Sequence, residues 1–258
     1  LKVVFENCTN KRAVELIVVL AGRSSSTNVV LWNELLLLAQ HQYCSNAQLV
    51  VFPHESGRGP CLNYGAQHAS GRILAFLHSD TKLPVQWDSK LVQRMMMMNQ
   101  QRDPNTVAWA FGFGIQKSAK TQCPGLRAIE TTANLRCWLW KLPYGDQCLC
   151  MHRSCFDYLG GFPHQCFMED YELIALLRRR NLLSMVPGPP ALCSPRRWLQ
   201  YGVLYVTYTN SRLVHLYSSG AVSPNEIYRQ YYGRSSSMEN NNNNNNTSSS
   251  PWEEELDR

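Results

Sequence analysis

Two separated acidic sites are the part of this 258-residue chain with the clearest capacity for chemistry. Asp80 follows a short apolar run that ends at Leu77, and Glu169 and Asp170 precede an apolar, helix-like segment. A carboxylate at the end of a buried strand can hold a divalent cation, because Mg²⁺ and Mn²⁺ prefer oxygen ligands. A carboxylate beside a substrate hydroxyl can act as a general base. The two sites together predict metal-assisted group transfer from a phosphorylated donor.

The elements that would position these acids alternate between strand and helix. Strand-like apolar runs and helix-like segments follow one another at 15–19, 33–41, 48–52, 59–69 and 72–77. This order is typical of parallel strands joined by right-handed crossovers, with helices on both faces of the sheet. Ligands of such sheets bind beyond the carboxyl ends of the strands, which is where His78 and Asp80 fall. We therefore predict an α/β fold with a mostly parallel sheet flanked by helices.

Each of these features also has a purely structural explanation. A lone Asp after a strand is more often a loop or cap residue than a metal ligand. Acids in the first turn of a helix complement the helix dipole without doing chemistry. Arg58, which follows Gly57 at the start of the second helix, could bind an anion together with free backbone N–H groups, or it could be a solvated side chain beside a tight turn. These residues taken singly leave both interpretations open.

Further blocks of sequence surround the two acidic sites. In chain order they are Gly57 to Ala66, LAFLHSDTKLP, Trp87-Asp88, Asn134-Leu135-Arg136, Leu142 to Gln147, LGGFP, MED, Arg178 to Arg180 and Ser194 to Trp198. Together these blocks, between about Val14 and Gly233, resemble family-2 glycosyltransferases of the GT-A fold. They are most similar to the branch often labelled rSAM/selenodomain-associated transferases. The resemblance implies metal-dependent, inverting transfer of a sugar from a nucleotide diphosphate donor to an acceptor hydroxyl.

The resemblance also implies a role for each matching residue. Asp80 matches the last Asp of the family's D-x-D element and would hold Mg²⁺ or Mn²⁺ against the donor diphosphate. Asp170 matches the Asp of the E-D element and would act as the general base. The residues assigned to donor and diphosphate binding are His78, Arg58, Asn63 and Arg197. The residues assigned to acceptor binding are Asp146, Gln147 and Glu169.

Several of these assignments keep an alternative. His78 stands where the family has its first Asp, and it either faces the nucleoside or is a partly buried histidine bonded to the backbone. Asp146 and Gln147 either contact sugar hydroxyls or satisfy their own turn. Arg196 and Arg197 either pair with diphosphate oxygens through their planar donors or belong to a solvated basic edge.

The N-terminal part of the chain departs from the family pattern. Family members open with a strand that ends in a Pro-x-x-Asn-Glu turn, a helix, and a second strand that ends in Asp-Gly-Gly-Ser. Here Leu20 stands where the base-contacting Asp is expected, and the residues before Val14 are too few for a strand and a helix. We expect that the nucleotide half of the site is truncated or has diverged. The alternative function is a catalytically inactive glycosyltransferase-like module that binds a sugar or a partner.

Composition predicts one folded domain and a tail. With 44% hydrophobic residues the chain can bury a sizeable core, which we place at 1–233. The Ser- and Asn-rich segment 234–258 is expected to be disordered, because it cannot bury enough apolar surface to order itself. No segment has the apolar length of a membrane span, and charged residues interrupt the start, so we predict neither a transmembrane helix nor a signal peptide. The expected location is the cytoplasm or an organelle stroma, in soluble or peripheral form.

The formal charge of +6 suggests anionic partners. The Arg residues are dispersed and no basic and aromatic motif typical of nucleic-acid binding appears, so we expect no nucleic-acid partner. The ten Cys residues lack the paired spacing of zinc sites and are expected to be mostly free. The Trp- and Tyr-rich segment from Trp198 to Val206 could make a peripheral membrane contact near a lipid-linked acceptor, or pack on the core, which we prefer. The acceptor itself stays unidentified.

Overall fold

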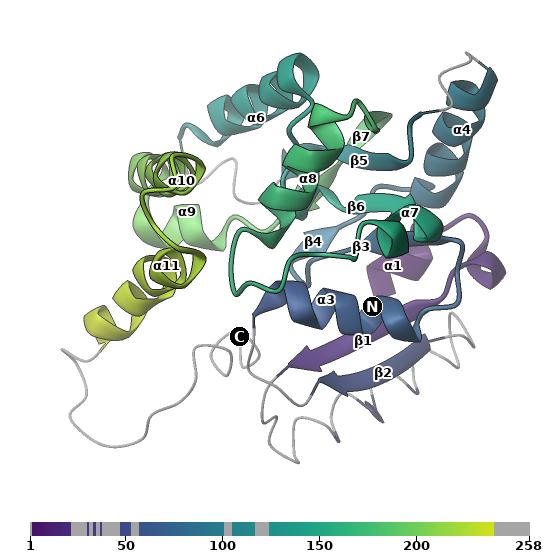
Figure 1. The fold of residues 1–258 in the computed structure, drawn as a ribbon, viewed down its shortest axis with the longest axis horizontal. Helices are drawn as coiled ribbons and strands as arrows, with labels where there is room; N and C mark the ends of the chain where they lie inside the picture. The colour runs from purple at the N-terminus through teal and green to yellow at the C-terminus, as the bar shows by residue number, and fades with distance from the viewer. Residues whose placement is uncertain are drawn as a thin grey trace.

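The computed structural model describes residues 2–21, 30, 33–34, 37, 47–52, 57–100, 105–116 and 124–239. Helices flank a two-stranded and a five-stranded sheet (Figure 1). The strands are β1 (Leu16–Ala21), β2 (Ala47–Phe52), β3 (Ile73–Phe76), β4 (Thr81–Lys82), β5 (Ala108–Ile115), β6 (Leu149–His152) and β7 (Leu183–Cys193). The longer helices are α3 (Arg58–His68), α4 (Trp87–Gln100), α6 (Leu126–Trp140), α8 (Glu169–Arg179), α10 (Val203–Ser218) and α11 (Pro224–Glu239). The short ones are α1 (Lys2–Glu6), α7 (Arg153–Tyr158), α9 (Arg196–Tyr201) and the 3₁₀ turns η1 (Lys11–Ala13) and η2 (Gly145–Gln147).

Strands β1 and β2 are parallel, and helix α3 packs on β1. A Cβ on Gly65 of α3 would lie only 2.8 Å from Cγ2 of Val19, so this close approach requires glycine. A small residue on this face of α3 therefore allows the helix to lie close to the sheet. Of the helix predicted at 33–41, the described residues Asn33, Glu34 and Leu37 are helical, and the remainder lies outside the described residues.

The five-stranded sheet has the order β3-β6-β5-β7-β4. The pair β5 and β7 is parallel, whereas β3 with β6, β5 with β6, and β4 with β7 are antiparallel. The α/β fold with flanking helices is confirmed, but the expected mostly parallel pairing is wrong for this sheet. A short apolar run does not reveal the direction of its partner. Strand β3 lies at the edge of the described sheet with Ala75 exposed, not covered on both faces.

Side chains of α6 complete the hydrogen bonds of β5 where β6 no longer pairs with it. Asn134 accepts a hydrogen bond from the Phe113 backbone N–H at 2.9 Å and donates to the Phe113 carbonyl at 2.8 Å. Glu130 accepts from the Ile115 N–H at 2.6 Å. Buried backbone groups need such partners, because an unpaired one costs as much as a lost hydrogen bond. These contacts anchor α6 to the centre of the sheet.

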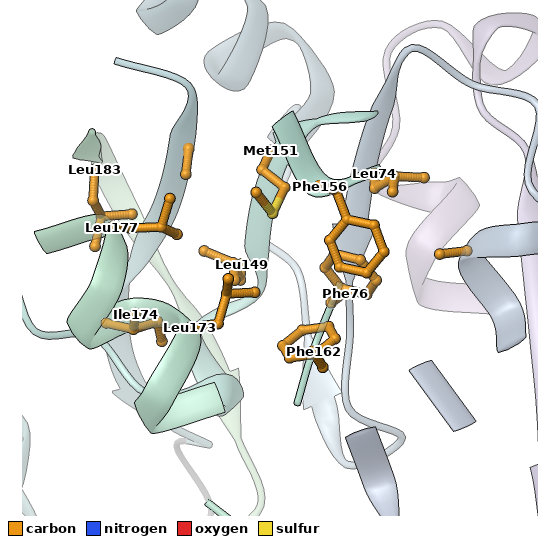
Figure 2. Close-up of a cluster of buried hydrophobic side chains, with 12 residues drawn as sticks. Leu74, Phe76, Leu149, Met151, Phe156, Phe162, Leu173, Ile174, Leu177 and Leu183 are labelled. Carbon is orange, nitrogen blue, oxygen red and sulfur yellow. The ribbon is translucent and has the colours of Figure 1, made fainter. Parts of the chain in front are cut away.

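A large apolar core holds α8 against the sheet (Figure 2). Its labelled side chains are Leu74, Phe76, Leu149, Met151, Phe156, Phe162, Leu173, Ile174, Leu177 and Leu183. The α8 residues Leu173, Ile174 and Leu177 repeat at the spacing of one helical face. Each fully buried side chain of this size contributes about 1.5–3 kcal/mol. The position of α8, and of the acidic residues in its first turn, is thus fixed by the core.

The N-terminal segment is tied to α4 by Asp88. Its carboxylate accepts hydrogen bonds from the Thr9 and Asn10 backbone N–H groups, each at 2.8 Å, and from the Cys8 thiol at 3.2 Å. Burial raises the pKa of Asp88, but these hydrogen bonds outweigh it, and the net pKa is lowered. The ionised carboxylate is therefore the form that holds this segment.

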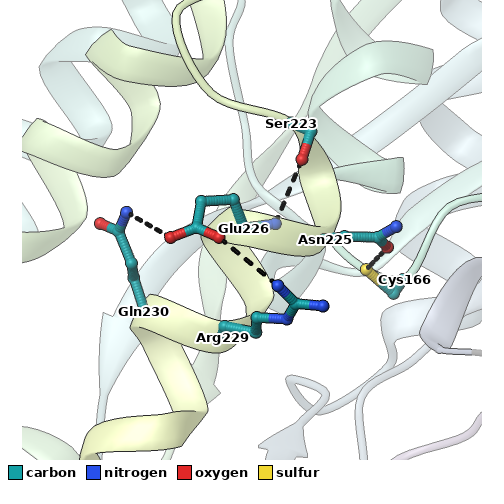
Figure 3. A network of polar contacts seen from close by, with 6 residues as sticks. All are labelled: Cys166, Ser223, Asn225, Glu226, Arg229 and Gln230. Carbon is teal, nitrogen blue, oxygen red and sulfur yellow. Dashed lines mark hydrogen bonds and ion pairs between the residues drawn. The ribbon is translucent and has the colours of Figure 1, made fainter.

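Helices α10 and α11 pack as a hairpin on the loop before α8 (Figure 1). Polar contacts fix the start of α11 (Figure 3): Ser223 Oγ accepts from the Glu226 N–H, and the Cys166 thiol donates to Asn225 Oδ1 at 3.0 Å. Helix α11 continues to Glu239, past the domain boundary expected at 233. Residues 240–258 lie outside the described residues, so the disordered tail stays a prediction.

Two expectations from composition can be compared with the described part of the chain. None of its helices has both the length and the apolarity that crossing a membrane requires. Its cysteines are free, and most of them are wholly or partly buried, as expected: Cys8, Cys61, Cys137, Cys148, Cys150, Cys155, Cys166 and Cys193.

Candidate active site

Asp170 is held in one orientation in the first turn of α8. The preceding Met168 adopts a left-handed conformation with φ of 64°, which is costly for a residue other than glycine and turns the chain into the helix. The Asp170 carboxylate accepts hydrogen bonds from the Gly145 N–H and the Tyr171 N–H, each at 2.8 Å. A carboxylate offers about four acceptor positions, so two remain for a substrate hydroxyl. This half-buried carboxylate is therefore held in place and can still accept further hydrogen bonds.

Gly145 brings Asp170 and His78 together. A Cβ on Gly145 would lie 2.7 Å from Asp170 Oδ2 and 2.7 Å from His78 Cε1, so both side chains press on this turn. Burial lowers the pKa of His78, nearby Arg58 lowers it further, and Asp170 and Asp80 oppose this effect. His78 is therefore neutral near pH 7. Among the described residues, none makes a hydrogen bond to the His78 ring. The structure therefore gives no support to the alternative that His78 is bonded to the backbone.

Asp146 is a second acidic group on the same turn. Its Oδ1 is buried and has no hydrogen-bond partner among the described residues. Burial raises the pKa of Asp146 to about 7, Asp170 raises it as well, and Arg136 opposes them. The residue as a whole is half-buried, so the burial concerns mainly this carboxyl end. Near neutral pH the group is protonated in a large fraction of molecules, and it can then donate a hydrogen bond as well as accept one.

Asp80 lies in the turn between β3 and β4 with 40% of its side chain exposed. Its recorded partner is Arg196, whose Nη2 is 3.7 Å from Oδ2, and an exposed pair of this kind contributes about 0–1 kcal/mol. Within the described ranges, no three His, Cys, Asp or Glu residues are grouped closely enough to hold a metal ion. An ion here would take Asp80 and fill its shell with diphosphate oxygens and water, as Mg²⁺ and Mn²⁺ readily do. Asp80 can supply one oxygen ligand to such an ion.

Glu169 and Arg58 form an ion pair, with Arg58 Nε 3.0 Å from Glu169 Oε1. The Glu169 side chain is 0% exposed. Burial raises the pKa of Glu169 to about 7, and the Arg58 charge opposes this. A fully buried carboxyl cannot reach an acceptor, so the acceptor-binding role predicted for Glu169 is corrected. Glu169 holds Arg58, which remains 29% exposed and carries its positive charge at the edge of the site.

Gln147 and Asn63 are committed to the protein backbone. Gln147 is 0% exposed, donates to the Phe111 carbonyl at 2.8 Å and accepts from the Tyr144 N–H at 3.0 Å. Asn63 donates to the Phe162 carbonyl at 2.8 Å and accepts from the Phe162 N–H at 2.9 Å. The acceptor role predicted for Gln147 is therefore corrected, because its side chain does not reach the surface. Asn63 holds the Gly-Gly-Phe loop, and because the residue is only half-buried its donor contact stays a prediction.

Arg197 lies in the first turn of α9 but points to α11. Its guanidinium carbon is 3.7 Å from the centroid of the Tyr231 ring. Its Nε is buried and has no hydrogen-bond partner among the described residues. The neighbouring Arg196, not Arg197, contacts Asp80. The donor-binding role of Arg197 stays a prediction.

Two contributors to the site were not predicted as site residues. They are the Gly145 backbone N–H and Arg136, whose guanidinium carbon lies 3.6 Å from the Tyr144 ring centroid. Arg136 belongs to a sequence block that resembles the family, so a signal was present. The role of Gly145 depends on Asp170, which is distant in sequence, and carries no local signal.

Helices flank the sheets, and the carboxylates of Asp170 and Asp80 both lie close enough to His78 to affect its charge. The sequence matches the family "Glycosyl transferase family 2" over residues 13–159, more than half of the chain. The chain therefore belongs to this family. No curated protein sequence matches it significantly. The narrower rSAM-associated branch stays a prediction.

Solved glycosyltransferase structures resemble this chain. The mannosyltransferase PcManGT from Pyrobaculum calidifontis, determined in complex with GDP-Man and Mn²⁺, aligns with a TM-score of 0.57 and 15% identity, covering 90% of this chain and 64% of that one. TarS 1–349 from S. aureus aligns with a TM-score of 0.48 and 13% identity, covering 75% of this chain and 55% of that one. The likeness to PcManGT shows a shared GT-A-like fold, and this chain spans less than two thirds of the length of PcManGT.

Proposed function

We propose that this chain transfers a sugar from a nucleotide diphosphate sugar to an acceptor hydroxyl, with Asp170 as the general base. The observation that carries the proposal is the setting of Asp170, which is oriented by the Gly145 and Tyr171 N–H groups and lies against the same turn as His78. A base that deprotonates the incoming hydroxyl supports a single displacement, which inverts the anomeric carbon. Inversion is therefore part of the proposal.

The charges around Asp170 suit a diphosphate donor. Asp80 would hold Mg²⁺ or Mn²⁺, which would neutralise charge on the leaving diphosphate. Arg196 beside Asp80 and Arg58 near His78 would donate N–H groups to anionic oxygens. His78, neutral near pH 7, would face the uncharged part of the donor.

Asp146 would position the acceptor. Its buried Oδ1 lacks a protein partner among the described residues, and its raised pKa lets it keep a proton beside Asp170. A protonated carboxyl can donate a hydrogen bond to the acceptor oxygen while Asp170 accepts the proton of that hydroxyl. Two carboxyl groups with different protonation states can thus serve one acceptor.

The test is a donor and turnover experiment. The purified chain is incubated with UDP- and GDP-hexoses and Mn²⁺, and release of nucleoside diphosphate is followed with candidate acceptors. Asp170→Asn should lose about 10²–10⁴-fold in turnover while keeping nucleoside diphosphate affinity in calorimetry. The exposed Asp157 supplies the matched control Asp157→Asn, which should behave as wild type.

Two outcomes would overturn this proposal. Equal turnover by Asp170→Asn and wild type would remove the base assignment. Wild-type protein that binds neither UDP nor GDP with Mn²⁺ would instead favour the second function, an inactive module that binds a sugar or a partner.

The acceptor class is proposed from the surface of α9 and α10. In the segment from Trp198 to Val206, some side chains pack on the core and others are exposed. Trp198 contacts Phe113 and Val206 is buried, whereas Leu204 is 85% exposed. Tyr208, one turn further along α10, is 68% exposed. Exposed Leu and Tyr side chains on α10, the helix that follows the half-exposed Arg196 of α9, suit the interface of an anionic membrane, where a lipid-linked acceptor would lie.

Vesicle flotation tests this contact. The chain should bind vesicles that contain an anionic lipid more tightly than neutral vesicles, and Leu204→Ser with Tyr208→Ser should reduce binding. Thr207→Ser on the same helix is the matched control. Equal flotation of all variants, or binding to neither vesicle, would contradict a membrane role for this surface.

A further inference from the structure

A stack of four side chains links helix α11 to the candidate site. The rings of Phe167 and Tyr231 lie with their centroids 4.7 Å apart and their planes 43° apart. The guanidinium carbon of Arg58 lies 4.9 Å from the Phe167 centroid, and that of Arg197 lies 3.7 Å from the Tyr231 centroid. The stack therefore joins residues from α3, the loop before α8, α9 and α11.

The ring pair is held by its own small core. Phe167 and Met168 are buried together with Leu213 of α10 and Ile227 of α11, and Tyr231 packs against this cluster. Polar contacts at the start of α11 attach the same helix to Cys166, directly before Phe167 (Figure 3). The position of the Tyr231 ring relative to the loop that leads to the base is thus set by both apolar and polar contacts.

The aromatic rings of this stack can fix the direction in which the two guanidinium groups point their N–H donors. A cation over an aromatic face is attracted by the ring quadrupole. A guanidinium that rests on a ring by its face directs its N–H groups outward in its own plane, where they suit anionic oxygens. The buried Nε of Arg197 lacks a hydrogen-bond partner among the described residues, and a ligand oxygen would remove the cost of leaving it unpaired.

We propose that Phe167 and Tyr231 are positioning residues that hold the guanidinium groups of Arg58 and Arg197 for the diphosphate of the donor. This inference rests on the proposed function, because that function supplies the diphosphate. It makes α11 part of the donor site, although the helix lies beyond the residues 13–159 that match the family. Tyr231 acts through Arg197 and does not itself contact the reacting atoms.

Calorimetry with UDP and with GDP, each with Mn²⁺, measures how the Tyr231 ring affects the affinity for nucleoside diphosphates. Tyr231→Leu should weaken binding by roughly 3- to 30-fold, the range of a cation and aromatic contact, whereas Tyr231→Phe should stay within about twofold because the ring is kept. Tyr217→Leu is the matched control, since Tyr217 packs in the same cluster but meets the Tyr171 ring edge to face. It should leave nucleotide affinity close to that of wild type.

A double-variant cycle separates positioning from packing. If Tyr231 acts through Arg197, then Tyr231→Leu should cause no further loss of affinity in an Arg197→Gln background. Thermal unfolding checks that each variant is folded, and the Tyr231→Phe comparison remains available should Tyr231→Leu unfold. Losses that simply add in the double variant, or loss of affinity in Tyr231→Phe equal to that in Tyr231→Leu, would overturn the role of the ring.

The outcomes also distinguish this inference from the proposed function. Wild-type protein that binds nucleoside diphosphates as tightly as Tyr231→Leu overturns the positioning role alone. Wild-type protein that binds none of them overturns the donor site and the positioning role together.

Discussion

The turn at Gly145 allows a direct test of how the base is held. In Gly145→Ala the new Cβ would lie 2.7 Å from both Asp170 Oδ2 and His78 Cε1. Unbonded carbon atoms normally approach to about 3.5 Å, so one neighbour or the turn must move by roughly 1 Å. The 2.8 Å hydrogen bond from the Gly145 N–H to Asp170 would be disturbed by the same movement.

The expected result follows from that displacement. A shift of about 1 Å in a catalytic group costs on the order of 100-fold in rate, so kcat of Gly145→Ala should fall by about this factor. A change in the donor KM would report displacement of His78, which is proposed to face the donor, whereas Asp170 is proposed to act on the acceptor. Overpacking should also lower the free energy of unfolding by about 1–3 kcal/mol. Initial rates over a range of donor concentrations and urea unfolding measure the two effects.

Gly160→Ala is the control for the glycine substitution itself. A Cβ on Gly160 would meet nothing within 4 Å, and its φ of 79° makes backbone strain the main cost of adding one. The control should lose about 1–2 kcal/mol of stability and keep the wild-type kcat. Wild-type kcat in Gly145→Ala would refute the argument that this turn fixes the base.

Three further substitutions test the metal, the N-terminal anchor and the loop before α8. Asp80→Asn should lose turnover, and added Mn²⁺ should not restore it. Wild-type protein treated with EDTA should recover its turnover with Mn²⁺ or Mg²⁺. Full activity of wild-type protein in excess EDTA would exclude the metal role. Because the folded pKa of Asp88 is lowered, its contribution to stability is present above the unfolded pKa of about 3.9 and is lost as the pH falls through the folded value. In urea unfolding measured over a series of pH values, the free energy of unfolding of Asp88→Asn should therefore fall less steeply at acid pH than that of wild type. An equal fall in both proteins would contradict the anchoring role of Asp88. Asn63→Leu leaves the Phe162 backbone N–H and C=O without their partner and should lower the free energy of unfolding by about 1–3 kcal/mol per unpaired group, and an unchanged urea midpoint would count against it.

Local patterns in the sequence were sufficient for the features that depend on neighbouring residues. Strands at 15–19, 48–52 and 72–77 and a helix that begins near Gly59 follow from the apolar periodicity and from Gly57, and the structure has strands and a helix there. The small face of that helix, with Gly65, could also be predicted, because close packing requires small side chains. Asp170 was placed in the first turn of a helix by the apolar residues that follow it.

Only the tertiary structure decided which polar side chains are available to a substrate. Gln147 and Glu169 have the residue types of a binding site, but each is fully buried, and their partners Phe111 and Arg58 are far away in the sequence. Asn63 bonds Phe162, which is 99 residues further along the chain. An amide or a carboxyl can satisfy a backbone group, a guanidinium or a substrate equally well by its chemistry. Which of these partners it meets is set by how distant segments pack, and strand direction in the five-stranded sheet was decided by tertiary packing for the same reason.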